Sequence, residues 1–115
     1  DIEIQTRTCH ALGIETAGGV FFPIIPANRK TPCQSSQVFT TDVAGATALD
    51  INVYQGSSRL VKDNVLVGTI NISGLPARMR GELDINVTFK VSEEQALSVV
   101  VEAEGMRKSA VLSYS

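Results

Sequence analysis

The sequence contains no tryptophan, and aromatic residues make up only 5% of its 115 residues. The core must therefore come from valine, isoleucine, leucine and alanine, within the 43% of residues that are hydrophobic. No apolar run approaches the roughly 18 consecutive residues of a membrane-spanning helix, so no membrane span is expected. The opening residues, Asp1–Glu3, do not resemble a signal peptide, although an excised domain can lose such a signal.

Cysteine and histidine are almost as scarce, which limits the chemistry that the chain can support. Cys9 and Cys33 are too few and too far apart for a zinc site or a disulfide framework, and His10 is the only histidine. The two thiols are expected to be reduced, as in a cytosolic-type compartment; a single bridge between them in a secreted adhesion-type sandwich is the alternative. Adjacent Cys9 and His10 suggest a catalytic dyad, but neighbours on a strand point to opposite faces, so no catalytic residue is predicted.

The charge balance argues against nucleic acid as the main partner. The net charge is −2, and lysine and arginine are scattered along the chain. The nearest approach to a basic cluster, Arg78–Arg80 with Arg107–Lys108 further on, is not interleaved with aromatic residues and is better explained by solvated turns. The pair Glu93–Glu94 is expected at a solvated turn, and no phosphate loop, zinc-ligand spacing or nucleophile elbow occurs.

Apolar and polar residues alternate along most of the chain, which is typical of β-strands. The clearest example is Asp84–Val91, where the apolar residues have even spacing. Turn residues separate the runs, and Arg59–Asn64 is a polar excursion that suggests a helical turn. Strands are predicted at about residues 9–15, 20–25, 34–41, 49–54, 66–72, 84–91, 97–103 and 109–113. About eight short strands indicate an all-β fold, a soluble antiparallel two-layer β-sandwich.

The segment Leu12–Val20 is the one around which the other strands are organised. Leu12 and Ile14 form an apolar strand face, and Gly18–Gly19 supplies backbone freedom for a loop before Val20 opens the next strand. A strand followed by a small-residue loop and a second, returning strand is suited to the rim of a binding site, where a ligand contacts the backbone. An ordinary hairpin gives the same local pattern.

Several segments closely resemble the peptide-binding β-domain of the seventy-kilodalton heat-shock chaperones, the heat shock protein 70 or DnaK-like family. They occur in the family's order and spacing, and the resemblance covers nearly the whole chain, from about Thr8 to Ser113. Each motif is weak alone, but together they are highly specific. The motifs are Leu12–Val20, Ser36–Thr41, Val53–Gly56, Lys62–Asn64 and Asp84–Phe89. The chain is therefore identified as a divergent member of this family.

The resemblance implies a chaperone module that is not itself an enzyme. It divides the chain into an interdomain linker remnant, residues 1–7, and a peptide-binding β-sandwich, residues 8–115, whose loops clamp an extended hydrophobic peptide. The ATPase domain, which would hold ATP and Mg²⁺, and the helical lid are absent from this chain, so no cofactor or metal is expected here. The implied partners are unfolded hydrophobic polypeptide segments and, for the parent protein, J-domain co-chaperones and nucleotide-exchange factors; nucleic acid and membranes are not among them. A cytoplasmic location is expected, with mitochondria and the lumen of the endoplasmic reticulum as alternatives.

The resemblance also implies site residues by position. Six residues match those lining the family's central side-chain pocket: Ile14, Thr16, Phe39, Leu49, Ile51 and Ile85. Thr40 matches a backbone hydrogen-bonding position beside the peptide, and Ala46 lies in the loop on the other side. Arg80 matches a residue that contacts the helical lid, and Ile2 and Ile4 belong to the interdomain linker. A plain core role is the alternative for the six pocket residues, and one or two are expected to be mostly core.

Three departures from the family pattern affect the expected function. The arch of two side chains that often closes over the peptide corresponds to Ala17 and Asp42. Because Asp42 is short and charged, an open or weakened arch and a preference for basic residues in the peptide are predicted. The linker, usually a run of leucines, is Asp1–Gln5, which buries less apolar area and puts ATP-driven coupling in doubt. Glu93–Gln95 stands where an Asn-Gly-type turn is usual, so a strained non-glycine residue is expected there.

These departures leave an alternative function open. A structural or regulatory β-sandwich that has lost peptide binding and serves as a docking module would have the same fold.

Overall fold

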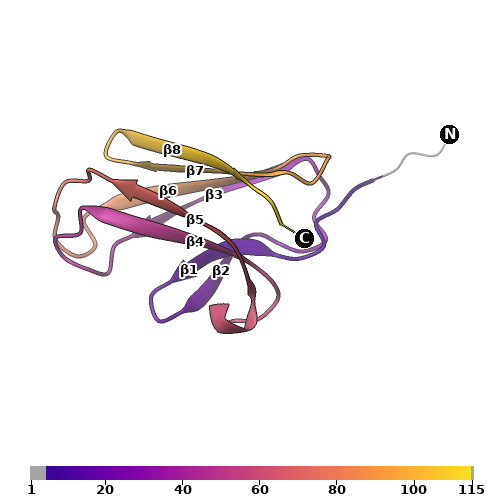
Figure 1. Cartoon of the computed structure of the whole chain (residues 1–115), viewed down its shortest axis with the longest axis horizontal. Helices are drawn as coiled ribbons and strands as arrows, with labels where there is room; N and C mark the ends of the chain where they lie inside the picture. Colours follow the sequence, from indigo (N-terminus) through magenta and orange to yellow (C-terminus); the bar gives the residue numbers. More distant parts are fainter. Residues whose placement is uncertain (1–4, 115) are drawn as a thin grey trace.

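The chain folds as two four-stranded antiparallel sheets that pack face to face, in a computed structural model that describes residues 5–114 (Figure 1). The first sheet has the order β2-β1-β4-β5 and consists of β1 (Leu12–Thr16), β2 (Val20–Ile25), β4 (Ala48–Gln55) and β5 (Val65–Ser73). The second has the order β3-β6-β7-β8 and consists of β3 (Cys33–Thr40), β6 (Asp84–Val91), β7 (Leu97–Ala103) and β8 (Met106–Leu112). The predicted eight-stranded, all-β sandwich is confirmed.

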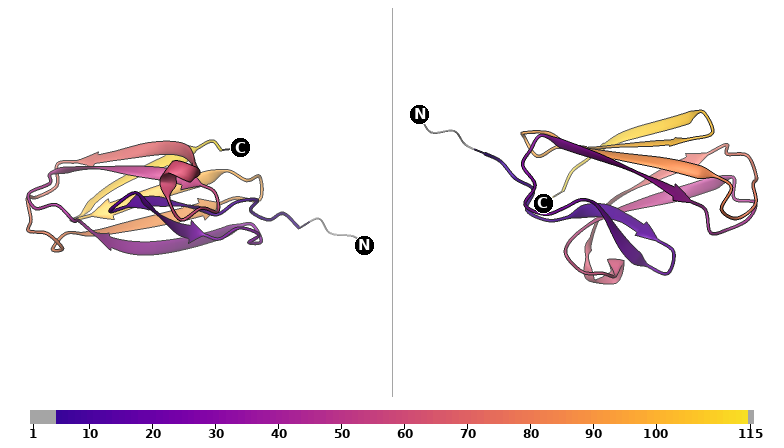
Figure 2. Two further views of the ribbon diagram at one scale, coloured as in Figure 1. Left: turned by 90° about the horizontal axis from the view of Figure 1, so that it is seen from below. Right: turned by 180° about the vertical axis from the view of Figure 1, so that it is seen from behind.

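The loops divide between the two ends of the sandwich. Loops 41–47 and 74–83 lie together at one end, and the first described residues and the segment after β8 lie toward the other (Figures 1 and 2). Between β4 and β5, the 3-10 turn η1 (Val61–Asp63) confirms the helical turn predicted within Arg59–Asn64. None of the helical structure in the described part of the chain is long and apolar enough to cross a membrane.

The prediction that the first strand begins at residue 9 is wrong. Cys9–His10 lies in a bend, and β1 begins at Leu12. The reason is the buried Thr8, whose hydroxyl donates to the carbonyl of Pro26 at 2.8 Å and accepts from the N–H of Arg29 at 2.9 Å. These bonds tie Thr8 to the segment that follows β2, outside the pairing of β1 with β2 and β4. The opposite-face argument against a Cys9–His10 dyad therefore does not apply, but no hydrogen bond joins these two described side chains.

The other strand bounds are closer to prediction. β2, β6 and β7 have the predicted bounds, and β3, β4 and β5 each differ by one residue at both ends. The last strand begins at Met106 rather than at Ser109. Glu104 and Gly105 both adopt positive φ, 50° and 75°, and close a tight turn in which Ala103 pairs with Met106. The tight turn therefore lets β8 pair with β7 from its first residue.

The N-terminal segment is joined to the sandwich where the structure describes it. Thr6–Thr8 runs antiparallel to Arg29–Thr31, and the two segments share a β-bridge and two backbone hydrogen bonds of 2.9 Å. Ile2 and Ile4, the predicted linker contacts, lie outside the described residues. The division of the chain into residues 1–7 and 8–115 stays a prediction.

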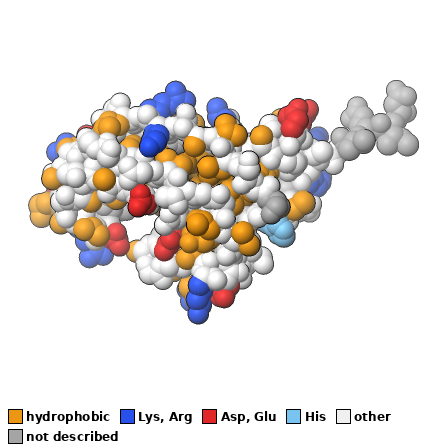
Figure 3. All heavy atoms as spheres, in the orientation of Figure 1, with side chains coloured by type: hydrophobic (Ala, Val, Ile, Leu, Met, Phe, Trp, Pro, Cys, Tyr) orange, Lys and Arg blue, Asp and Glu red, His pale blue; other side chains and the backbone are white. Residues whose placement is uncertain are grey.

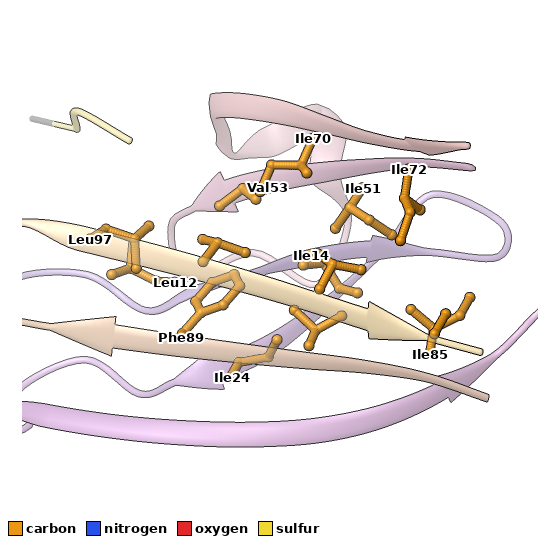
Figure 4. Close-up of a cluster of buried hydrophobic side chains, with 14 of the residues drawn as sticks. Leu12, Ile14, Ile24, Ile51, Val53, Ile70, Ile72, Ile85, Phe89 and Leu97 are labelled. Atoms are coloured by element: carbon orange, nitrogen blue, oxygen red, sulfur yellow. The ribbon is translucent and has the colours of Figure 1, made fainter. Parts of the chain in front are cut away.

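The alternation of the strands produces the core. On β6, the side chains of Ile85, Val87, Phe89 and Val91 are buried between the sheets, and the polar residues between them are more exposed. Figure 4 shows that side chains from both sheets meet in one cluster, whose labelled members are Leu12, Ile14, Ile24, Ile51, Val53, Ile70, Ile72, Ile85, Phe89 and Leu97.

Candidate functional site

A cavity of about 940 Å³ lies where β1, β2 and β4 of the first sheet face β3 and β6 of the second. Its deepest lining is formed by Ile14, Ile51 and Ile85, which are buried and belong to the core (Figure 4). Leu49 and Phe39 also line the cavity, and both are half-buried against the same core. Because side chains alternate along a strand, these five all project from inner faces. The cavity thus extends the hydrophobic core to the surface.

The structure brings the predicted peptide-binding residues together, with one exception. Nine of the ten line this cavity, and Ala46 does not. The nine are Ile14, Thr16, Ala17, Phe39, Thr40, Asp42, Leu49, Ile51 and Ile85. Ala46 is half-buried in loop 41–47, next to Gly45, whose N–H donates to the carbonyl of Arg78 at 2.8 Å. Whether any of the ten binds a peptide stays a prediction.

Two loops at the cavity rim are joined through their backbones. Besides the bond from Gly45, the N–H of Gly81 donates to the carbonyl of Thr41 at 3.0 Å. The N–H of Leu75 donates to the carbonyl of Thr47, also at 3.0 Å. Arg80 lies between these anchor points and lines the cavity. Its predicted contact with a helical lid stays a prediction.

The opposite side of the rim is the turn between β1 and β2. The Thr16 hydroxyl donates to the carbonyl of Val20 at 2.9 Å, and the N–H of Gly19 donates to the carbonyl of Thr16 at 3.1 Å, so this turn is closed by its own bonds. Ala17 and Gly18, at its tip, are exposed and line the cavity. A methyl group and a hydrogen reach little across the mouth, and the open arch predicted for Ala17 and Asp42 stays a prediction.

Carboxylates outnumber basic groups around the cavity. Glu15, Asp42 and Asp50 line it together with one cation, Arg80. The Glu15 carboxylate accepts from the side-chain amide of Asn52 at 3.1 Å, whereas no hydrogen bond or ion pair holds the exposed Asp42 carboxylate among the described residues. The Asp42 carboxylate is therefore available to a charged partner. Within residues 5–114, no group of three or more histidine, cysteine or acidic residues could hold a metal ion.

Sequence reasoning missed one prominent lining residue, Phe22. Its side chain is 37% exposed and lines the cavity beside Phe39, with ring centroids 5.2 Å apart and ring planes at 85°. Phe22 pairs with Ile14 across β1 and β2, so the two side chains share the inner face. The spacing of Val20, Phe22 and Ile24, two residues apart, could have indicated that Phe22 faces the inner side of the sheet.

The other open seam between the sheets, where β5 and β8 run, also carries hydrophobic side chains (Figure 3). Val65 and Leu66 are each more than half exposed there. A hollow of about 340 Å³ is lined by residues of β5 and by Tyr114. None of the predicted peptide-binding residues lines this hollow, so the seam is a control surface for the cavity.

The family model for "Hsp70 protein" matches residues 1–113. The chain belongs to the Hsp70 family. It is 39% identical over 99 residues to the mitochondrial heat shock protein SSC3 of Saccharomyces cerevisiae, covering 86% of this chain and 15% of that relative. It is 41% identical over 113 residues to the chaperone protein DnaK of Picrophilus torridus, covering 98% and 18%, and 37% identical over 115 residues to DnaK of Thermosipho melanesiensis, covering 100% and 19%.

This Hsp70 chain spans less than a fifth of the length of these relatives. The strained non-glycine residue predicted in the Glu93–Gln95 turn is confirmed. Gln95 adopts φ of 65°, the left-handed region that non-glycine residues rarely enter. The turn is held by the N–H of Gln95, which donates to the carbonyl of Ser92 at 3.0 Å, and by the N–H of Ala96, which donates to the Ser92 hydroxyl at 3.1 Å.

Proposed function

We propose that this chain is the substrate-binding module of an Hsp70 chaperone and holds extended hydrophobic segments of unfolded proteins. The observation that carries the proposal is the convergence of nine residues, assigned by their positions in the family resemblance, on one cavity continuous with the core. The chain itself would carry out no chemical reaction.

The backbone of a guest peptide would bond to the rim. β3 is the edge strand of its sheet and pairs only with β6, so one edge of its backbone is free for an extended segment near Thr40. Such bonds use groups that every peptide has. They favour an extended conformation and tolerate many sequences.

One guest side chain would enter the aliphatic lining formed by Ile14, Leu49, Ile51 and Ile85. Full burial of one leucine side chain contributes about 1.5–3 kcal/mol. Micromolar affinity needs about 8 kcal/mol. The pocket therefore selects the register of the guest, and most of the affinity must come from the backbone bonds and neighbouring contacts.

For the parent protein, the proposal includes an ATPase domain that holds ATP and Mg²⁺, a helical lid that contacts Arg80, J-domain co-chaperones and nucleotide-exchange factors. Weak coupling through the polar linker and a cytoplasmic location are part of the same proposal. The mitochondrial location printed for SSC3 belongs to that relative.

The experiment is fluorescence anisotropy of the 115-residue chain with a labelled leucine-rich heptapeptide. Leu49→Trp should fill the pocket and abolish binding. Leu66→Trp places the same large side chain on the control seam at a residue that is 53% exposed, and it should bind like the wild type. Circular dichroism checks the fold of both variants. Unchanged binding by Leu49→Trp would remove the pocket assignment, and no binding by the folded wild type would favour the docking-module alternative.

A further inference from the structure

We infer that the cavity has an aromatic subsite, formed by Phe22 together with Phe39, which makes this chain prefer guest segments that carry an aromatic side chain. The inference rests on the proposed function and deepens it, because it names the class of guest side chain and adds Phe22 as a specificity-determining residue. Three observations carry it.

The first observation is the geometry of the two rings. Phe22 comes from β2 of one sheet and Phe39 from β3 of the other, and they meet edge to face at 5.2 Å. A perpendicular pair leaves ring faces that its own members do not cover, and Phe22, which is 37% exposed, lines the cavity. A third ring can meet such a pair edge to face, whereas an aliphatic side chain gains only buried area.

The second observation is the fixed position of Phe22. The register of β1 and β2 shifts between Leu12 and Gly13, and β2 approaches β1 so closely that a Cβ on Gly13 would lie 2.0 Å from the carbonyl oxygen of Phe22. The backbone that carries the Phe22 ring therefore lies in close contact with its neighbouring strand. A ring carried by a paired strand costs a guest less reorganisation of the site than a ring on an unpaired loop.

The third observation is the room at the mouth. Ala17 and Asp42 present short side chains on the rim, and the volume of the cavity is about 940 Å³. A bulky planar side chain can pass between them. The aliphatic lining beneath, Ile14 and Ile51, then covers the part of a guest ring that Phe22 does not.

The test uses three heptapeptides that differ only at the central residue, which is leucine, phenylalanine or cyclohexylalanine. Cyclohexylalanine has nearly the bulk of phenylalanine and at least its hydrophobicity, but no π-system. The wild-type chain should bind the phenylalanine peptide about two- to tenfold more tightly than either of the others, the range expected for one aromatic pair. Phe22→Leu should reduce both ratios to about one, because the remaining contacts are aliphatic.

Phe21→Leu is the matched control, since the neighbouring ring is buried and does not line the cavity. It should keep the wild-type ratios, and thermal melts show whether each variant is folded. Equal binding of the phenylalanine and cyclohexylalanine peptides, or a preference that survives in folded Phe22→Leu, overturns the aromatic subsite. Binding of all three peptides without preference leaves the proposed function standing and removes this inference alone, whereas no binding at all removes both.

Discussion

Gly13 and the carbonyl of Phe22 lie so close together that no side chain fits between them: a Cβ on Gly13 would lie 2.0 Å from the Phe22 oxygen and 2.7 Å from its carbon. Backbone atoms cannot move aside as a flexible side chain can. Gly13→Ala should therefore push β2 away from β1 and lower the free energy of unfolding by about 1–3 kcal/mol. Urea unfolding measures this change.

Gly68→Ala is the control for that substitution. Its Cβ would meet only the side chain of Leu112, at 3.0 Å, and that side chain can change its rotamer. We expect a smaller loss of stability than for Gly13→Ala. If Gly13→Ala is as stable as the wild type, the close approach of β1 and β2 is not a constraint on the sequence.

The loop between β4 and β5 is closed by Asn64. Its side-chain oxygen accepts from the N–H of Ser58 at 3.0 Å, and its amide nitrogen donates to the carbonyl of Ser58 at 2.8 Å. Asn64→Ala leaves both half-buried backbone groups without this partner and should cost about 1–3 kcal/mol. Asn71→Ala, at an exposed position on β5, should cost less. Thermal melts of the two variants compare them, and equal melting temperatures would refute the role of Asn64.

The free carboxylate of Asp42 should favour basic residues in a guest. Exposed ion pairs contribute about 0.2–1 kcal/mol, so Asp42→Asn should weaken binding of a lysine-flanked peptide by about two- to fivefold. Binding of an uncharged peptide should not change, and added salt should reduce the difference. Asp63→Asn, on η1 away from the cavity, is the control. An Asp42→Asn variant with unchanged affinity for the basic peptide contradicts the prediction.

Tyr114 should make the chain less stable at high pH. Burial, and then the thiolates of Cys9 and Cys33, raise the pKa of the Tyr114 phenol above its ordinary value of 10.0. In the interval between the ordinary pKa and the raised one, the folded chain binds more protons than the unfolded chain, so stability falls as the pH rises. Below that interval the phenol is neutral in both states, and it contributes no pH dependence.

Absorbance titration of the Tyr54→Phe variant measures this pKa directly, because Tyr114 is then the only tyrosine. The midpoint should lie above 10, and replacing both cysteines with serine should lower it without removing the part due to burial. A midpoint at or below 10 would show that the phenol is neither buried nor near the thiolates.

The sequence predicted the strand bounds best where the alternation of apolar and polar residues alone determines them. β6 has the predicted bounds because its apolar residues alternate without interruption and point into one core, and in β7 Leu97, Val99, Val101 and Ala103 keep the same spacing although Val100 lies between them. The start of β1 could not be predicted, since it depends on the bonds that Thr8 makes to residues far along the chain. Local alternation contains no information on such bonds.

The candidate site shows the same limit. The motif resemblance supplied nine of the lining residues, including Leu49 and Ile85, which lie on different sheets. It did not supply Phe22, because the contact with Phe39 depends on how β2 of one sheet faces β3 of the other. Neither the volume of the cavity nor the exclusion of Ala46 from its lining follows from a single strand pattern.

The most direct test of the account is an amide chemical-shift titration of the isotope-labelled chain with the leucine-rich heptapeptide. We predict saturable shifts concentrated at the cavity, at Thr16, Thr40, Leu49 and Ile85, with little change at the β5 and β8 seam. Shifts that instead gather around that seam, or the absence of any shift at millimolar peptide, would contradict the claim that this cavity receives an extended polypeptide.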